Sequence, residues 1–452
     1  MARYNVDGSL DTSFNRTGSL IGPQQSLAHA VAIQPDGKIL AAGMFANHFA
    51  IFRYNVDGTL DNTFGTRGVS STTITTKKGF DAIWAMGLQS DGKIVVAGTG
   101  SGLAVARYFA QATTLDGVTY AAGSLDPAFG TGGIALSGLA TSPMGWTTQM
   151  SLAIDPLTRN IVVEAPGAGG KAMVVRYASN GKLDTTFAST GYETLTYLSS
   201  HAGLAIQPTD GKIVVTGFYN DGVRAGDGLV RLNTDGTLDT SFGNGGAALV
   251  PFRMAGPASV IIQADGHVVL GTAVDVKDNS GHTLGEFLVT RFASSGSLDT
   301  SFGLNGAATV PYALLPQGSL CNGMAIEPDG RIVVAGVPTI SGTFYPFEVA
   351  RLLATGPQIG SFASMLNPNG SETLTASSTS ITDGNPAATI TQVEFYYFDS
   401  NGNKVSLGNG VLNGQGDWPL TVNLPAGTTV FAQAEDNYGV LGDPTALTLT
   451  IP

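Results

Sequence analysis

The sequence predicts an all-β protein, because three features indicate short strands joined by tight turns. Glycine accounts for 61 of 452 residues, charged residues for only 12% and hydrophobic residues for 43%, which suits turn-rich strands better than helices with charged surfaces. Short apolar runs flank polar turns, and Asp-Gly in such turns supplies the positive φ that a tight hairpin requires. The same text also recurs at a regular interval, so the strands belong to a repeat.

The repeat begins with a hairpin, first written as AVAIQPDGKILAAG over residues 30–43. An apolar run with one arginine follows, then the motif LDxxFG and a further short apolar run. We name these four expected strands A, B, C and D. The hairpin occurs six times, and the arginine stands at Arg3, Arg53, Arg107, Arg176, Arg231, Arg291 and Arg351, 50 to 69 residues apart. Repeats of this length made of short strands predict a six-bladed β-propeller over residues 1–355.

The chain starts at strand C of an incomplete repeat and leaves the sixth hairpin after strand C. We therefore expect the apolar run at residues 18–22 to complete the last blade, which would pair two otherwise free sheet edges. The opening text, MARYNVDGSL, is repeat sequence and not a signal peptide. This favours a fragment or mature form of a longer protein.

The text changes after residue 360. Alternating polar and apolar runs, separated by DSNG, LPAG and DNYG, predict a β-sandwich over residues 360–452. The linker, around residues 354–360, is short.

The repeat resembles a named family. RYNVDGSLDTSF followed by AVAIQPDGKILAAG is similar to the bacterial delta-60 repeat, and the hairpin half resembles NHL-type propeller blades. VEFYYFD with AGTTVFAQAEDNYG resembles the Ig-like domains of bacterial secreted and cell-surface proteins. The resemblance implies a propeller whose strand A lines the central tunnel, and an extracellular or cell-surface location. It implies a fold more than an activity.

Charge and cysteine content exclude some partners. The net charge is −12, which repels phosphate backbones, so nucleic acid is not an expected partner. No run of 18 apolar residues is present, so we expect no membrane insertion. The single cysteine, Cys321, rules out an internal disulfide framework and has no identifiable activating partner.

The aspartates of DGSLD and LDxxFG offer two interpretations. Carboxylates four residues apart suit calcium, but we expect a structural role, in which Asp accepts hydrogen bonds from turn amides and Phe packs between blades. The arginines are then partners of these aspartates. A separate loop from Val274 to Glu286 has partial calcium-loop spacing, with Lys277 where a third oxygen ligand belongs.

Function is expected where the repeats differ, on the face that carries the B–C loops and the entries to strand A. His29 and His201 precede strand A in their repeats, His48 and His282 lie in B–C loops, and Glu164 replaces a small residue of strand B. Polar or aromatic residues in the same frame are Asp81, Trp84, Arg224, Arg253 and Asn322.

These residues support competing functions. In the first, the propeller binds a protein or glycan through this face, with Trp84, Arg224, Arg253 and Asn322 as ligand-binding residues. In the second, the chain is a calcium-dependent hydrolase of the lactonase or esterase type, since six-bladed propellers of the paraoxonase and senescence-marker families carry such activity. That alternative assigns His29, His201 and Glu164 as catalytic residues and Asp81, Glu164 and Asn322 as calcium ligands. A purely structural surface protein is a third alternative.

Overall fold

A computed structural model describes the chain except for residues 6–7, 75–80, 101, 142–149, 251–258, 278–282, 301, 304–305, 317–318, 328–330, 341–342, 345–347, 353–357, 360, 378–380, 383–389, 400–403, 437–444 and 450–452. The described part is built from short strands, with one 3₁₀ turn at Ala168–Gly170.

The first repeat shows how the sequence makes a sheet. Strands β1 (Ser26–Ile33), β2 (Ile39–Phe45), β3 (His48–Tyr54) and β4 (Val69–Thr72) pair antiparallel in the order β1-β2-β3-β4. Gly37 in the first turn has φ +80°, a conformation that glycine adopts without strain. The expected strands A to D are thus the four strands of one sheet.

The later repeats follow the same plan. The second sheet contains β5 (Ala82–Leu88), β6 (Ile94–Gly100), β7 (Gly102–Tyr108) and β10 (Ile134–Leu136), with a side hairpin of β8 (Thr113–Leu115) and β9 (Val118–Tyr120). The long strand β14 (Tyr192–Ile206) joins the third and fourth repeats into one sheet, with β11 (Ser151–Ile154), β12 (Ile161–Pro166), β13 (Lys171–Tyr177), β15 (Ile213–Asn220), β16 (Ala225–Leu232) and β17 (Ala247–Leu249). The fifth has β18 (Ser259–Ile262), β19 (Val268–Lys277), β20 (Thr283–Phe292) and β21 (Ala307–Pro316), and the sixth has β22 (Ser319–Ile326), β23 (Ile332–Ile340), β24 (Thr343–Phe344) and β25 (Glu348–Leu352).

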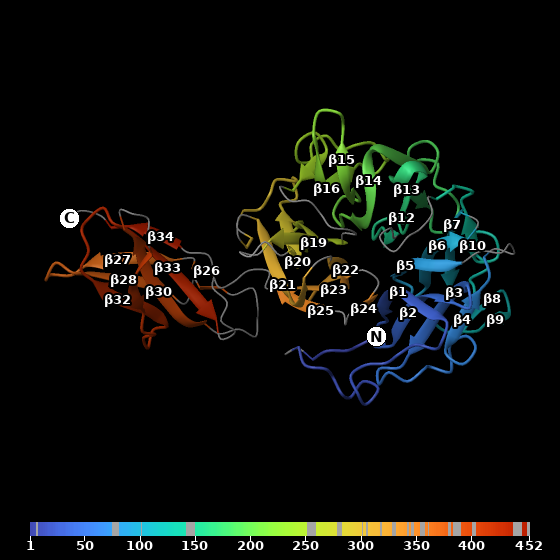
Figure 1. Ribbon diagram of the computed structural model, residues 1–452, viewed down its shortest axis with the longest axis horizontal. Coiled ribbons are helices and arrows are strands. Elements are labelled where there is room, and N and C mark those ends of the chain that lie inside the picture. The colour runs from blue at the N-terminus through green and yellow to red at the C-terminus, as the bar shows by residue number, and fades with distance from the viewer. Residues whose placement is uncertain are drawn as a thin grey trace.

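The sheets stand around a common centre (Figure 1). Their first strands are neighbours in chain order, from β1 to β5, β11, β14, β18 and β22. The core lies between successive sheets. Leu40 and Ile51 of the first repeat, for example, pack with Ile94 and Val96 of the second. The repeats therefore form a β-propeller whose strand A faces the centre.

Each LDxxFG motif closes an arginine network between neighbouring repeats. The arginine of strand C pairs with the motif's aspartate at 2.6–2.9 Å and lies 4.5–4.9 Å over the motif's phenylalanine ring. In five networks the same guanidinium donates to a turn carbonyl of the next repeat. The pairs are Arg3–Asp11, Arg53–Asp61, Arg107–Asp126, Arg176–Asp184, Arg231–Asp239 and Arg291–Asp299. The expected structural role of these aspartates and arginines is confirmed.

The network also shows that the A–B and C–D turns lie at one end of the sheet. Lys38 of the first A–B turn donates to Asp61 Oδ2 at 2.8 Å, and Thr63 N–H donates to Asp61 Oδ1 at 3.0 Å. Burial raises the pKa of Asp61, but hydrogen bonds from Lys38 and Thr63 and the charge of Arg53 outweigh it and hold the pKa well below its usual value.

The expected closure by residues 18–22 differs from the structure. This run pairs with the start of the chain, where Arg3 N–H donates to Gly18 O at 2.9 Å, because the incomplete repeat carries its own strand C. Within the described residues it does not pair with β25. The face of β1 on this side is correspondingly open, with Val31 64% exposed, whereas Leu204 at the same repeat position is 6% exposed.

Residues after Gln358 form a second unit, which we call the C-terminal unit. Two sheets face each other, one of β27 (Phe362–Leu366), β28 (Glu372–Ser377) and β32 (Asp417–Val422), the other of β31 (Lys404–Asn409), β30 (Ile390–Phe398), β33 (Thr429–Asp436) and β34 (Thr445–Thr448). A short pair of β26 (Gln358–Ile359) and β29 (Ile381–Thr382) precedes them. Leu374, Phe395, Trp418 and Val430 fill the space between the two sheets. Among the described residues of the whole chain, no helix is long and apolar enough to cross a membrane.

Candidate functional site

The central strands carry β-bulges at the position where the repeats differ. The bulge of β1 falls at His29, that of β5 at Trp84 and that of β22 at Asn322, and β14 has a wider irregularity from His201 to Gly203. A bulge inserts an unpaired residue and redirects its side chain. We call His29, Trp84 and Asn322 the bulge row.

A glycine of strand B makes room for the bulges of β1 and β5 and for the irregularity of β14. A Cβ on Gly43 would lie 2.0 Å from Leu27 O, and one on Gly98 would lie 2.1 Å from Ala82 O. The same holds for Gly217, at 2.2 Å from Ser199 O. The repeated glycine within strand B is therefore a sequence signal of the bulge, and the sequence-based prediction did not include it.

The first two members of the bulge row are in contact. The His29 and Trp84 rings lie 4.1 Å apart, centroid to centroid, at 30°. Trp84 Nε1 donates to Thr99 Oγ1 at 3.3 Å, and the indole packs against the core cluster that includes Met150, which precedes β11. Met150 occupies the equivalent position of the third repeat, so side chains of three successive repeats gather here.

Burial lowers the pKa of His29. At neutral pH the imidazole is therefore uncharged, and it can accept as well as donate a hydrogen bond. An uncharged imidazole beside an indole forms an aromatic surface with a polar edge. Such a surface suits an uncharged ligand better than an anionic phosphate.

Other predicted residues of this face are placed less fully. Asn322 is exposed on β22. His201 lies in β14, but its side chain is outside the described residues, as are all of Arg253 and His282. His48 starts β3 and its Nδ1 lies 3.2 Å from Thr73 Oγ1, while His267 lies beside Asp265 on the opposite turn face.

Two of the predicted calcium ligands, Asp81 and Glu164, are buried side chains. Asp81 is buried, and its Oδ2 accepts the Ile74 N–H at 2.8 Å, which fixes the loop before β5. Glu164 is fully buried within β12, where its backbone lies opposite Ser151 and Val174. Across the described part of the chain no three His, Cys, Asp or Glu side chains lie close enough to hold a metal ion.

Arg224, between β15 and β16, is held by its own hairpin and by the C–D connection of the same repeat. Its guanidinium donates to Asp221 Oδ2 at 2.9 Å, to the Tyr219 hydroxyl at 2.9 Å and to the Asn244 carbonyl. Backbone and side-chain hydrogen bonds hold the pKa of Asp221 well below its usual value. Val223 at the tip of this turn is 91% exposed. The arginine thus stiffens a loop that presents an apolar tip.

Two further residues of interest from the sequence lie in strands. In the partial calcium loop from Val274 to Glu286, the described residues form a β-ladder in which Asp275 pairs with Gly285, and residues 278–282 lie outside the described residues. Cys321 is 1% exposed, and burial raises the pKa of its thiol to about 12, so it is protonated at neutral pH.

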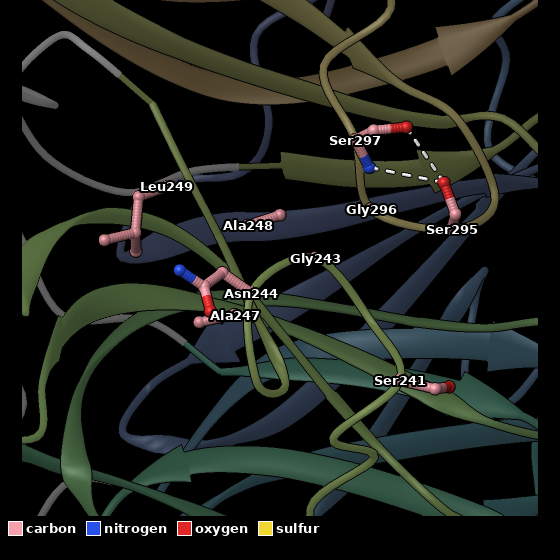
Figure 2. Close-up of a pocket in the computed structure, with 9 residues that line it drawn as sticks. All are labelled: Ser241, Gly243, Asn244, Ala247, Ala248, Leu249, Ser295, Gly296 and Ser297. Carbon is pink, nitrogen blue, oxygen red and sulfur yellow. Dashed lines mark hydrogen bonds between the residues drawn. The ribbon is translucent and has the colours of Figure 1, made fainter.

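A cavity of about 410 Å³ lies on the opposite face, among the repeated turns. Figure 2 shows its lining, which comes from the C–D connections of the fourth and fifth repeats. The lining residues are Ser241, Gly243, Asn244, Ala247, Ala248, Leu249, Ser295, Gly296 and Ser297. None is ionisable, so this cavity offers no acid, base or charged ligand group.

Comparison with known proteins supports the fold. A family model described as "Domain of unknown function (DUF5122) beta-propeller" matches residues 1–14, 34–64, 89–111, 209–242 and 327–356. These segments contain the repeated hairpin, arginine and LDxxFG text. No curated protein matches the chain.

Solved structures resemble it only weakly. A protein of unknown function from Dyadobacter fermentans has 13% identity and a TM-score of 0.39, covering 72% of this chain and 93% of that one. One of unknown function from Bacteroides caccae has 13% identity and a TM-score of 0.33, with coverage of 64% and 88%. An exo-β-1,3-galactanase from Phanerochaete chrysosporium has 11% identity and a TM-score of 0.31, with coverage of 98% and 97%. Similarity at this level carries no argument about function. The matched segments and the sheet order together support a β-propeller.

Proposed function

We propose that this chain is a secreted or cell-surface protein in which a six-bladed propeller of delta-60 repeats binds a protein or glycan ligand, followed by an Ig-like domain. The ligand contacts the bulge row at the central strands. The observation that carries this proposal is the 4.1 Å contact between His29 and Trp84, which belong to bulges of neighbouring repeats.

The difference between the turn face and the bulge row supports the same site. The turn face is held by nearly identical arginine networks, which bind the repeats to one another. The bulge row instead carries a histidine, a tryptophan and an asparagine at one repeat position. A bulge needs a glycine opposite it, but it does not need these side chains, so their variety favours ligand contact over scaffolding.

The test is binding of the purified full chain to a glycan array, compared with the His29→Ala and Trp84→Ala variants. Val118→Ala is the matched control, because Val118 is 53% exposed and lies in the same repeat as Trp84 but on the side hairpin β8–β9. We expect at least one glycan signal to fall tenfold or more in both bulge variants and to stay unchanged in the control. Equal binding by all four proteins would contradict the site, and an array without signal would remove the glycan half of the proposal.

The same purified proteins also test the alternative function, a calcium-dependent hydrolase. A panel of lactones and short esters is incubated with calcium and again with EDTA. Turnover that disappears on chelation and in Glu164→Gln would replace the binding proposal with the enzyme.

A further inference from the structure

The outer face of the sheet β31-β30-β33-β34 in the C-terminal unit holds a cluster of aromatic rings. Successive side chains of a strand point to opposite faces of a sheet. Val393 and Phe395 of β30, and Val430 and Ala432 of β33, are buried in the core between the two sheets. Tyr396, Phe398 and Phe431 therefore lie on the other face, which the core does not use.

The three rings form one rigid group. Tyr396 and Phe431 stack with centroids 5.4 Å apart at 15°, and Phe398 meets them edge-on at 5.7 Å and 5.4 Å. Lys404 Nζ lies 4.0 Å from the Tyr396 centroid and is itself fixed by Glu394 at 2.9 Å. Tyr396 is thus enclosed, while Phe398 remains 49% exposed.

The register places short side chains beside the rings. Ser406 lies opposite Tyr396 and Ala446 lies opposite Phe431, so the aromatic pair is flanked on both outer strands by small residues. Thr429 and Thr448 form a hydroxyl pair at 3.1 Å in the next row. The direct cross-strand neighbours of the two stacked rings are therefore small, although Tyr396 itself is only 4% exposed.

Polar groups continue the same face. Asn409 Nδ2 donates to Gln392 Oε1 at 2.8 Å, and Gln392 Nε2 donates to Glu435. Glu394 and Lys404 lie between these amides and the rings. One face therefore combines exposed aromatic carbon with amide, hydroxyl and carboxylate groups.

We propose that this face is a second binding surface, and that its ligand is a neutral polysaccharide. A pyranose ring offers C–H groups on its faces, which pack on an aromatic ring, and hydroxyls around its edge, which both donate and accept hydrogen bonds. The polar and aromatic groups run along β30 from Gln392 to Phe398, roughly 20 Å at 3.3 Å per residue, a length that suits several sugars of one chain. Glu394, Glu435 and the net charge of −12 disfavour polyanionic ligands, including nucleic acid and acidic glycans.

Cross-strand aromatic pairs also stabilise sheets. That role accounts for Tyr396 and Phe431, which are stacked. Phe398 contacts both rings edge-on but remains 49% exposed, so it is the ring with the most surface left for a ligand. Phe398 is therefore the residue that separates a binding role from a structural one.

The test is native affinity electrophoresis of the full chain in gels that contain a soluble β-1,4-glucan, a β-1,3-glucan, an arabinoxylan or a galactomannan. We expect at least one of them to retard the protein, and Phe398→Ala to raise the dissociation constant tenfold or more. Phe398→Tyr, which keeps the ring, should retain binding. Val411→Ala is the control, because Val411 is 75% exposed in the loop before β32.

Thermal unfolding of each variant shows that the fold is intact before mobility is compared. No retardation by any of the four polysaccharides would overturn the proposal, as would retardation that Phe398→Ala leaves unchanged. Retardation lost in Trp84→Ala but kept in Phe398→Ala would place glycan binding on the propeller alone. Loss in Phe398→Ala with unchanged binding by Trp84→Ala is the result that supports this second surface.

Discussion

The Asp61→Asn substitution tests whether the arginine network holds the repeats together. Asparagine keeps an oxygen for the Thr63 N–H but removes the charge at Oδ2, which Arg53 and Lys38 each approach to 2.8 Å. Arg53 is 3% exposed, so the substitution leaves a buried guanidinium without its anion. Breaking a buried pair in this way costs about 3–5 kcal/mol.

Urea denaturation at pH 7, followed by circular dichroism, measures the loss. Asp57→Asn is the matched control, because Asp57 accepts hydrogen bonds from Thr59 in the neighbouring turn but is solvated. We expect a clear fall in the denaturation midpoint for Asp61→Asn and little change for the control. A loss of less than about 1 kcal/mol in the free energy of unfolding of Asp61→Asn would refute the reasoning, because breaking a buried ion pair should cost more.

The pH dependence gives an independent check of the same network. The pKa of Asp61 is lower in the folded chain than in the unfolded chain, so its stabilisation is fully present above the unfolded pKa, about 3.9. It is lost as the pH falls through the folded value. The stability difference between wild type and Asp61→Asn should therefore narrow below about pH 4. A difference that stays constant from pH 7 to pH 3 would contradict the assigned cause.

Three further predictions concern the central strands. Gly98→Ala places a Cβ 2.1 Å from Ala82 O, so it should lower the free energy of unfolding by about 2 kcal/mol or more in urea denaturation. It should also abolish ligand binding at Trp84 on the array. Cys321 should resist iodoacetamide at pH 8 in the folded chain and react only after denaturation, as mass spectrometry would show. Rapid alkylation of the folded chain would contradict its burial. The His29 imidazole should titrate below 6.5 in NMR and move toward that value in Trp84→Ala, because the indole contributes to its burial, whereas an unchanged titration would deny the contact.

Local chemistry made much of the propeller predictable. Asp-Gly turns, the arginine of strand C and LDxxFG recur in fixed order, and each corresponds to a short-range contact within a repeat or between neighbours. The structural role of Asp61 and Phe64 followed from turn chemistry and burial. The partner of residues 18–22 was not predictable in the same way. Two strands C could pair with this run, the one at the start of the chain and the one in the sixth repeat.

The candidate sites were harder to derive. His29 and Trp84 could be placed in one frame by alignment of the repeats, but their contact depends on bulges, and the glycine opposite each bulge reads as an ordinary strand residue. Glu164 stood out because it replaced alanine, yet alternation along β12 directs it into the core. Strand alternation around VEFYYFD predicted a sheet but did not show that three rings from β30 and β33 meet on its outer face.

The most direct test of the binding proposal is ¹⁹F NMR of the full chain labelled with 5-fluorotryptophan, titrated with the glycan that gives the strongest array signal. The chain has three tryptophans, and a Trp84→Phe variant assigns the resonance that matters. Trp84 lies in the bulge row, whereas Trp418 lies in the core of the C-terminal unit. A saturable shift of the Trp84 resonance, absent in His29→Ala, is the predicted result, and a titration that binds glycan without moving Trp84 would contradict the proposed site.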